Sequence, residues 1–211
     1  MTLPIVFGSK TQLMNFFTKF IIDDRLASLK NDVDRCLPAS AAKKESTGYA
    51  PFPALLYCFS IIDLLGATYA GNARSHQTTE NTARYMKKYM KYPDDKIGLL
   101  MKIYRHKIVH LSQPKGAMLY NGQLISWGHD EMNPSAHLAI DSNPGDFPIY
   151  DYGQIHCDGR FIVSIWALRD NIIESVTRMP DGYFEDLKNS IDLQNKFLTA
   201  VNQIFDPVIT D

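Results

Sequence analysis

The stretch from Leu99 to Leu111 reads Leu-Leu-Met-Lys-Ile-Tyr-Arg-His-Lys-Ile-Val-His-Leu, and its apolar residues recur at the spacing of an α-helix. At about 100° per residue, one helix face collects apolar side chains. These are Ile97, Leu100, Met101, Tyr104, Ile108 and Leu111. Leu99 and Ile103 lie on the far side, so we expect this helix to be buried on more than one face, as in a helical bundle.

The segments around this helix predict further helices. Apolar periodicity and proline stops place helices at 11–37, 53–71, 78–92 and 94–112, and further helices at 164–179 and 183–205. The 53–71 segment approaches the length of a membrane span. Asp63 lies in its middle, however, and a carboxylate at the centre of a bilayer costs about 3 kcal/mol. A helix buried in a bundle or in a dimer interface is therefore the better interpretation.

Between the fourth and fifth helices, the sequence predicts a small β insertion at about residues 117–163. Asn121-Gly122 is typical of the type I′ turn of a hairpin across 118–125. Residues 154–157 and 160–163 predict a second hairpin, and 137–140 are a candidate for a short strand. The predicted fold is mainly α, a single domain over residues 1–211 in which a helical bundle carries a small antiparallel β-hairpin insertion.

Charge is distributed unevenly along the chain. The net charge is −1, but residues 84–115 carry nine basic and two acidic side chains, whereas the remainder carries 13 basic and 21 acidic ones. A local basic segment on an acidic chain is typical of a surface that binds phosphates, and a solvated helix face explains it equally well. The lysines expected to contact RNA are Lys87, Lys88, Lys91, Lys102 and Lys107.

Cysteine use and the beginning of the chain bear on its compartment. The three cysteines, Cys36, Cys58 and Cys157, are an odd number without CxxC spacing, which favours reduced thiols. The first residues show no basic segment followed by a long apolar run, so no signal peptide is predicted. We therefore expect a cytoplasmic protein that is not held in a membrane.

Arg105 and His110 are the strongest chemical lead. They lie five residues apart, about 140° around a helix, and a second copy packed on the far side would gather two arginines and two histidines in one cleft. RNA supplies its own nucleophile, the 2′-hydroxyl, so its cleavage needs a base, an acid and a cation for the phosphorane. Histidine serves the first two roles and arginine the third, with no metal or other cofactor.

The run Arg105-His106-Lys107-Ile108-Val109-His110, near the end of a bundle helix, resembles the signature of the HEPN superfamily. The resemblance covers residues 50–115 and points to an uncharacterised bacterial HEPN-like subgroup with a β insertion. It implies a homodimeric, metal-independent endoribonuclease that acts on single-stranded RNA, in a toxin–antitoxin or phage-defence setting where an antitoxin or another protein partner is expected. It implies Arg105 and His110 as the catalytic pair, His106 at the polar position of the motif, and Asp63 as a supporting acidic residue.

Other interpretations of the same residues stay open. A catalytically silent HEPN-like module could bind RNA, a nucleotide or a protein, with Arg105 in an ion pair and His110 in the interior. His106 and His110 are also spaced as half of a zinc site, for which a third ligand would come from His129, His156, Cys157 or Asp158. On the 78–92 helix, basic residues alternate with Tyr85, Met86, Tyr89, Met90 and Tyr92. A half-buried helix with solvent-reaching lysines is the favoured interpretation there, ahead of a base-stacking surface.

Overall fold

The computed structural model describes residues 5–37, 50–74, 77–111, 114–129, 134–143, 145–148 and 153–206. Over this part the protein is mainly α-helical, with a small mixed four-stranded sheet and a separate two-stranded hairpin. The chain divides into two compact units. One comprises Met1–Lys30, Ser60–Tyr92 and Asn171–Asp211, and the other comprises Asn31–Phe59 and Pro93–Asp170. The expectation of a single domain stays a prediction.

The predicted helices are present, some of them with π-helical turns. In order they are α1 (Lys10–Phe17), the π-helical η1 (Thr18–Leu26), α2 (Ala27–Cys36), α3 (Pro51–Ala70), α4 (Thr78–Tyr85) and the π-helical η4 (Met86–Met90). They continue with α5 (Asp94–Leu99), the π-helical η5 (Leu100–Arg105), α6 (His106–Leu111), α7 (Ile165–Thr177), α8 (Tyr183–Asn189) and α9 (Ile191–Phe205). The predicted 183–205 helix is interrupted at Ser190, whose extended backbone ends α8 and whose hydroxyl caps α9 by accepting from the Leu193 N–H.

Aromatic rings fill the core of the first unit. The Phe17 ring lies 5.6 Å from that of Tyr183 and 5.2 Å from that of Phe197, and the Tyr85 and Tyr89 rings lie 5.1 Å apart. All five side chains are fully buried. Large rings such as these remove more apolar surface from water than any other side chains, and they therefore dominate the stability of this unit.

Helices α3 and α4 approach each other closely at Gly66. A Cβ atom at this position would lie 2.8 Å from the Thr82 backbone nitrogen and 2.9 Å from the Asn81 carbonyl oxygen. Real Cβ atoms do not approach backbone atoms so closely, so only glycine permits this crossing. Gly66 is buried, as are Asn81 and Thr82 opposite it.

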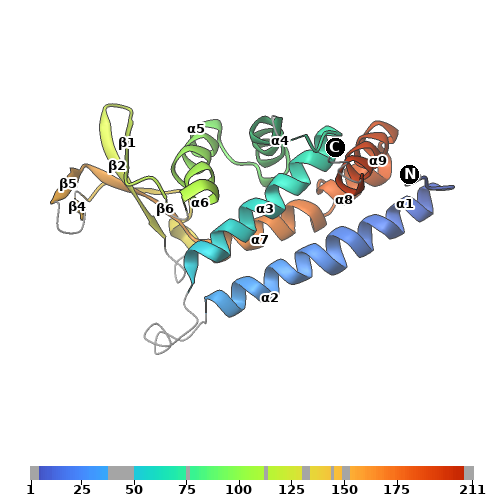
Figure 1. Cartoon of the computed structure of the whole chain (residues 1–211), viewed down its shortest axis with the longest axis horizontal. Helices are drawn as coiled ribbons and strands as arrows, with labels where there is room; N and C mark the ends of the chain where they lie inside the picture. The colour runs from blue at the N-terminus through green and yellow to red at the C-terminus, as the bar shows by residue number, and fades with distance from the viewer. Residues whose placement is uncertain are drawn as a thin grey trace, which may run out of the picture. The chain divides into compact units, whose positions relative to one another are not determined.

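The second unit contains the sheet, in the order β1-β2-β6-β3. Its strands are β1 (Ala117–Tyr120), β2 (Gln123–His129), β3 (Ile140–Asp141) and β6 (Gly159–Val163), and the hairpin strands are β4 (Gly145–Pro148) and β5 (Gln154–Cys157). The predicted hairpin across 118–125 is confirmed, because Asn121 and Gly122 have φ angles of 50° and 80°. Figure 1 shows these strands beside the green helix formed by α5, η5 and α6.

Two predictions about the β region were wrong. Strands β5 and β6 do not form a hairpin with each other, since β5 pairs with β4 and β6 runs parallel to β2. The residue between them, Asp158, is held by Leu124: its N–H donates to the Leu124 carbonyl, and its carboxylate accepts from the Leu124 N–H, both at 2.7 Å. The candidate strand at 137–140 reduces to Ile140, since Leu138 has a φ of 62°, outside the strand region. The expected antiparallel insertion is therefore a mixed sheet with a hairpin.

Candidate functional site

The Arg105–His110 motif lies on one continuous helix, the motif helix, which consists of α5, η5 and α6. It begins at Asp94 and is described as far as Leu111, close to the predicted bounds. Two carboxylates, Asp94 and Asp95, occupy its first turn, where the partial positive charge of the helix N-terminus favours them. The Ile97 N–H donates to the Pro93 carbonyl at 2.9 Å and starts the hydrogen-bond ladder. The acidic residues that favour a helix N-terminus are thus present at the start of this helix.

The middle of this helix, from Leu100 to Arg105, is a π-helix. The His106 N–H reaches back five residues to the Met101 carbonyl instead of four. Most side chains of this segment are buried, as is the residue before it: Leu99, Leu100, Met101, Ile103 and Tyr104. The prediction that this helix is buried on more than one face is therefore confirmed, and π-turns of this kind occur frequently at functional sites.

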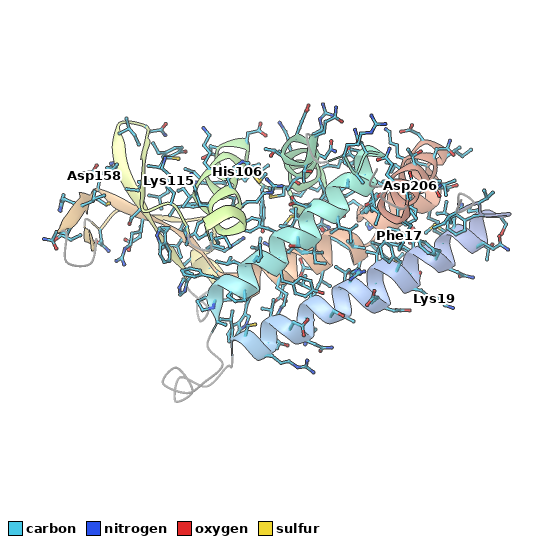
Figure 2. The ribbon with its side chains drawn as sticks, in the orientation of Figure 1. Phe17, Lys19, His106, Lys115, Asp158 and Asp206 are labelled. Carbon is cyan, nitrogen blue, oxygen red and sulfur yellow. The ribbon has the colours of Figure 1, made fainter. Side chains whose placement is uncertain are left out.

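The polar side chains of the segment are less buried than its apolar ones. Lys102 is exposed, and Arg105 and His106, three and four residues further on, are half-buried. Figure 2 shows His106 on the green helix. Lys107 is also half-buried. His110 lies within α6, but its side chain is outside the part of the structure that is described.

Arg105 and His106 are joined by a hydrogen bond, with 3.4 Å between the Arg105 Nη1 and the His106 Nδ1. A guanidinium carries only donors, so the imidazole nitrogen in this bond must be the acceptor. The hydrogen of the neutral ring therefore sits on Nε2. Neither head group is enclosed in a dry interior, which satisfies the first requirement for contact with a phosphate.

Tyr104, the residue before Arg105, fixes this helix to the sheet. Its hydroxyl accepts the Gly128 N–H at 3.2 Å, and it lies within hydrogen-bond distance of two carbonyls, that of Gly128 and that of Phe161 at 3.0 Å. The side chain is fully buried, and this burial raises the pKa of its hydroxyl far above the usual range. Sequence reasoning placed Tyr104 in the core but missed its polar role, because its partners lie 24 and 57 residues away along the chain.

Asp63, the expected supporting residue, lies in the first unit, whereas Arg105 belongs to the second. Its carboxylate accepts from the Thr82 hydroxyl at 2.6 Å, and its side chain is half-buried. This hydrogen bond links Asp63 on α3 to Thr82 on α4. Its role at the motif stays a prediction.

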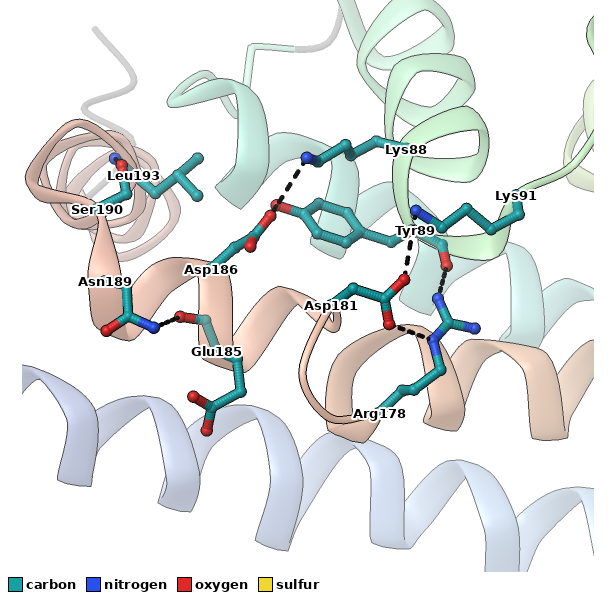
Figure 3. Close-up of polar contacts among 10 residues, drawn as sticks. All are labelled: Lys88, Tyr89, Lys91, Arg178, Asp181, Glu185, Asp186, Asn189, Ser190 and Leu193. Atoms are coloured by element: carbon teal, nitrogen blue, oxygen red, sulfur yellow. Dashed lines mark hydrogen bonds and ion pairs between the residues drawn. The ribbon is translucent and has the colours of Figure 1, made fainter.

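The basic face of α4 and η4 is confirmed as one side of a half-buried helix. The aromatic and methionine residues of 85–92 are buried, and Arg84, Lys87, Lys88 and Lys91 are exposed. Two of the lysines face acids of the same chain: Lys88 Nζ lies 3.3 Å from Asp186 and Lys91 Nζ lies 3.6 Å from Asp181 (Figure 3). The buried rings do not offer a stacking surface. RNA contact by Lys87, Lys88 and Lys91 stays a prediction.

Two other residues considered for chemistry, His156 and Cys157, lie on strand β5. His156 donates from Nδ1 to Asp146 at 2.9 Å across β4 and β5, with both side chains exposed. Cys157 is buried, and desolvation is the main cause that raises the pKa of its thiol, which disfavours the nucleophilic thiolate. Among the described residues, no group of three or more His, Cys, Asp or Glu side chains is arranged to hold a metal ion.

The α3 helix is long and apolar enough to cross a membrane by composition, and 56% of its most apolar window is buried in the protein. A buried core helix passes the same test, so this feature is weak evidence in either direction.

Comparison with protein-family models, with curated proteins and with solved structures finds no match to this chain.

Proposed function

We propose that the protein is a metal-independent endoribonuclease of HEPN type that cleaves single-stranded RNA as a homodimer. The observation that carries the proposal is the pairing of Arg105 and His106 on the side of the motif helix that the core leaves open. The π-helical segment that ends at Arg105 adds support, because such turns concentrate at functional sites. The HEPN-like bundle and the setting in toxin–antitoxin or phage defence belong to the same proposal.

In this mechanism, a 2′-hydroxyl of the RNA attacks the adjacent phosphorus while a histidine removes its proton. A second histidine protonates the departing 5′-oxygen, which leaves a 2′,3′-cyclic phosphate and a free 5′-hydroxyl. His110 of each copy supplies one of these two steps. Arg105 donates hydrogen bonds to the non-bridging oxygens, whose negative charge grows in the phosphorane. Lys102 and Lys107 hold the neighbouring phosphates.

The experiment incubates the purified protein with single-stranded RNA in the presence of a chelator and identifies the products by mass spectrometry. We expect 2′,3′-cyclic phosphate ends, and no cleavage of the same sequence made with 2′-deoxyribose. His110→Ala and Arg105→Ala should remove cleavage while the far-ultraviolet circular dichroism stays unchanged. His156→Ala, which removes an exposed histidine on β5, is the matched control and should cleave at the wild-type rate. Cleavage that survives His110→Ala would contradict the proposal.

A second candidate is a catalytically silent module that binds RNA, a nucleotide or a protein partner. It is favoured by the engagement of Lys88 and Lys91 with acids of the same chain, which weakens the basic character of that face. RNA binding that falls steeply with salt and is not followed by any cleavage would support this candidate.

A further inference from the structure

Strand β1 lies at one edge of the four-stranded sheet, and no strand among the described residues pairs with its outer side. Its Leu119 lies opposite Leu124 of β2, but the N–H and carbonyl of Leu124 both bond to Asp158. Leu119 and Leu124 are therefore a non-hydrogen-bonded pair, and the N–H and carbonyl of Leu119 point away from β2. The same alternation turns those of Ala117 outward. Leu119 is 71% exposed, so this edge is open to water.

Strand β1 lacks features that usually protect such an edge. Soluble proteins place a lysine, a proline or a β-bulge on an exposed edge strand, because its unpaired backbone groups otherwise pair with another chain. β1 reads Ala-Met-Leu-Tyr and pairs with β2 residue for residue, without a bulge. Its last residue, Tyr120, donates from its hydroxyl to Asp95 at 2.9 Å and so fixes the strand to the motif helix. The edge is therefore uncharged and already held in an extended form.

We propose that β1 is an interface at which two copies of this chain pair their strands, antiparallel, around a two-fold axis at Met118. Ala117 of each copy then lies opposite the partner's Leu119, and every outward N–H and carbonyl of these residues is bonded. An antiparallel edge is its own complement under a two-fold axis, and an uncharged strand does not repel its copy, which favours a second copy over a foreign segment. The inference rests on the proposed function for the expectation of a homodimer, and it names the interface.

The residues on either side of β1 fix this register. An axis one residue later would set Ala117 opposite the partner's Asn121, whose φ of 50° lies outside the strand region. An axis one residue earlier would need the Lys115 N–H, which already donates to the Ile103 carbonyl at 2.8 Å. The axis at Met118 is the register that uses only residues of β1.

The pairing fixes the side of the sheet on which the two motif helices lie. Met118 shares a sheet face with Ile125 and Phe161, and the Tyr104 ring of the motif helix lies 6.1 Å from the Phe161 ring on that face. Paired residues of neighbouring strands point to the same face, so the two motif helices lie on one side of the joined sheet. Each copy keeps its own Arg105, and strand pairing can therefore be measured separately from RNA cleavage.

Sedimentation equilibrium of the full chain measures the pairing. A strand-edge interface is small, so we expect a weak dimer whose share grows between about 1 and 100 μM. Leu119→Lys places a like charge on both strands at a side chain that is exposed in the single chain, and it should weaken the dimer about tenfold with unchanged circular dichroism. Ile191→Lys, which replaces an exposed side chain outside β1, is the matched control and should leave the dimer unchanged.

A cysteine at the axis tests the register independently. The two Met118 residues form a non-hydrogen-bonded pair in this register, with Cα atoms about 4.5 Å apart, which lies within the range of a disulfide. Met118→Cys should therefore give a disulfide-linked dimer under mild oxidation faster than Met179→Cys, the same change at an exposed residue outside β1.

The outcomes for the strand interface and for the nuclease are distinguishable. A wild type that stays monomeric at about 100 μM overturns the proposal and leaves the edge to an extended segment of another protein. A dimer that survives Leu119→Lys, with Met118→Cys linking no faster than Met179→Cys, overturns the β1 interface but not a nuclease that dimerises elsewhere. A wild type that pairs through β1 and cuts no RNA supports the interface and contradicts the nuclease.

Discussion

The hydroxyl of Tyr104 accepts the backbone N–H of Gly128 at 3.2 Å, and this contact ties the motif helix to the central strand β2. The same hydroxyl donates toward carbonyls of β2 and β6. One buried side chain thus carries the polar connection between the residue next to Arg105 and two strands. It is also the connection that a single substitution can remove without changing the shape of the core.

Tyr104→Phe should destabilise the protein by about 1–3 kcal/mol, because it removes the hydrogen-bond partner of part-buried backbone groups of Gly128 and of the buried Phe161 carbonyl. Urea unfolding followed by circular dichroism measures the change. The matched control is Tyr120→Phe, which removes the exposed hydrogen bond from Tyr120 to Asp95 and should cost less than about 1 kcal/mol. Equal effects in the two variants would contradict a special role for the buried hydroxyl.

Gly66→Ala and Gly98→Ala should shift stability in opposite directions, although both glycines lie inside helices. At Gly66 the new methyl group would meet the backbone of Asn81 and Thr82, and such overpacking costs about 1–3 kcal/mol. At Gly98 a Cβ meets nothing within 4 Å, so the higher helix propensity of alanine should stabilise by about 0.5–1 kcal/mol. Thermal unfolding of the two variants beside the wild type tests the sign of each change.

The salt dependence of RNA binding should separate the two basic faces. Lys102→Ala should reduce the slope of log K against log salt by about 0.7, the value for one phosphate contact on a single strand. Lys91→Ala should change the slope less, because Asp181 already balances this charge. A larger change for Lys91→Ala than for Lys102→Ala would move the RNA-binding surface to α4 and η4.

Asp181 should make the first unit sensitive to acid. The hydrogen bond from Arg178 Nε at 2.9 Å is the main cause that lowers the pKa of this carboxyl below its usual value of 3.8. A lowered folded-state pKa contributes stability that is present above the unfolded value and is lost as the pH falls through the folded value. Acid unfolding below about pH 4 should therefore begin at a higher pH in Arg178→Ala than in the wild type, and NMR titration should show the Asp181 pKa rising.

The sequence was sufficient for the helices and for one hairpin, because these depend on local signals. The spacing of Ile97, Met101 and Tyr104 predicts the buried face of the helix that carries Arg105. The two residues Asn121-Gly122 are enough to predict the turn of the β1–β2 hairpin. Strand pairing depends on residues far apart, so periodicity could not show that β6 runs beside β2. The same limit applies to the site. The motif singled out Arg105 and His106 as site residues, but only the coordinates show that the Arg105 guanidinium donates to the His106 Nδ1.

The parallel pairing of β2 with β6 has a kinetic consequence. The β1–β2 hairpin closes over two residues and can form within about 1–10 μs, whereas β6 can join only after the chain from 130 to 158 has been brought back to β2. Tyr104 bonds to groups of both strands, so its docking completes only at that later stage. The surface that presents Arg105 should therefore be among the last parts of this unit to reach its final form during refolding.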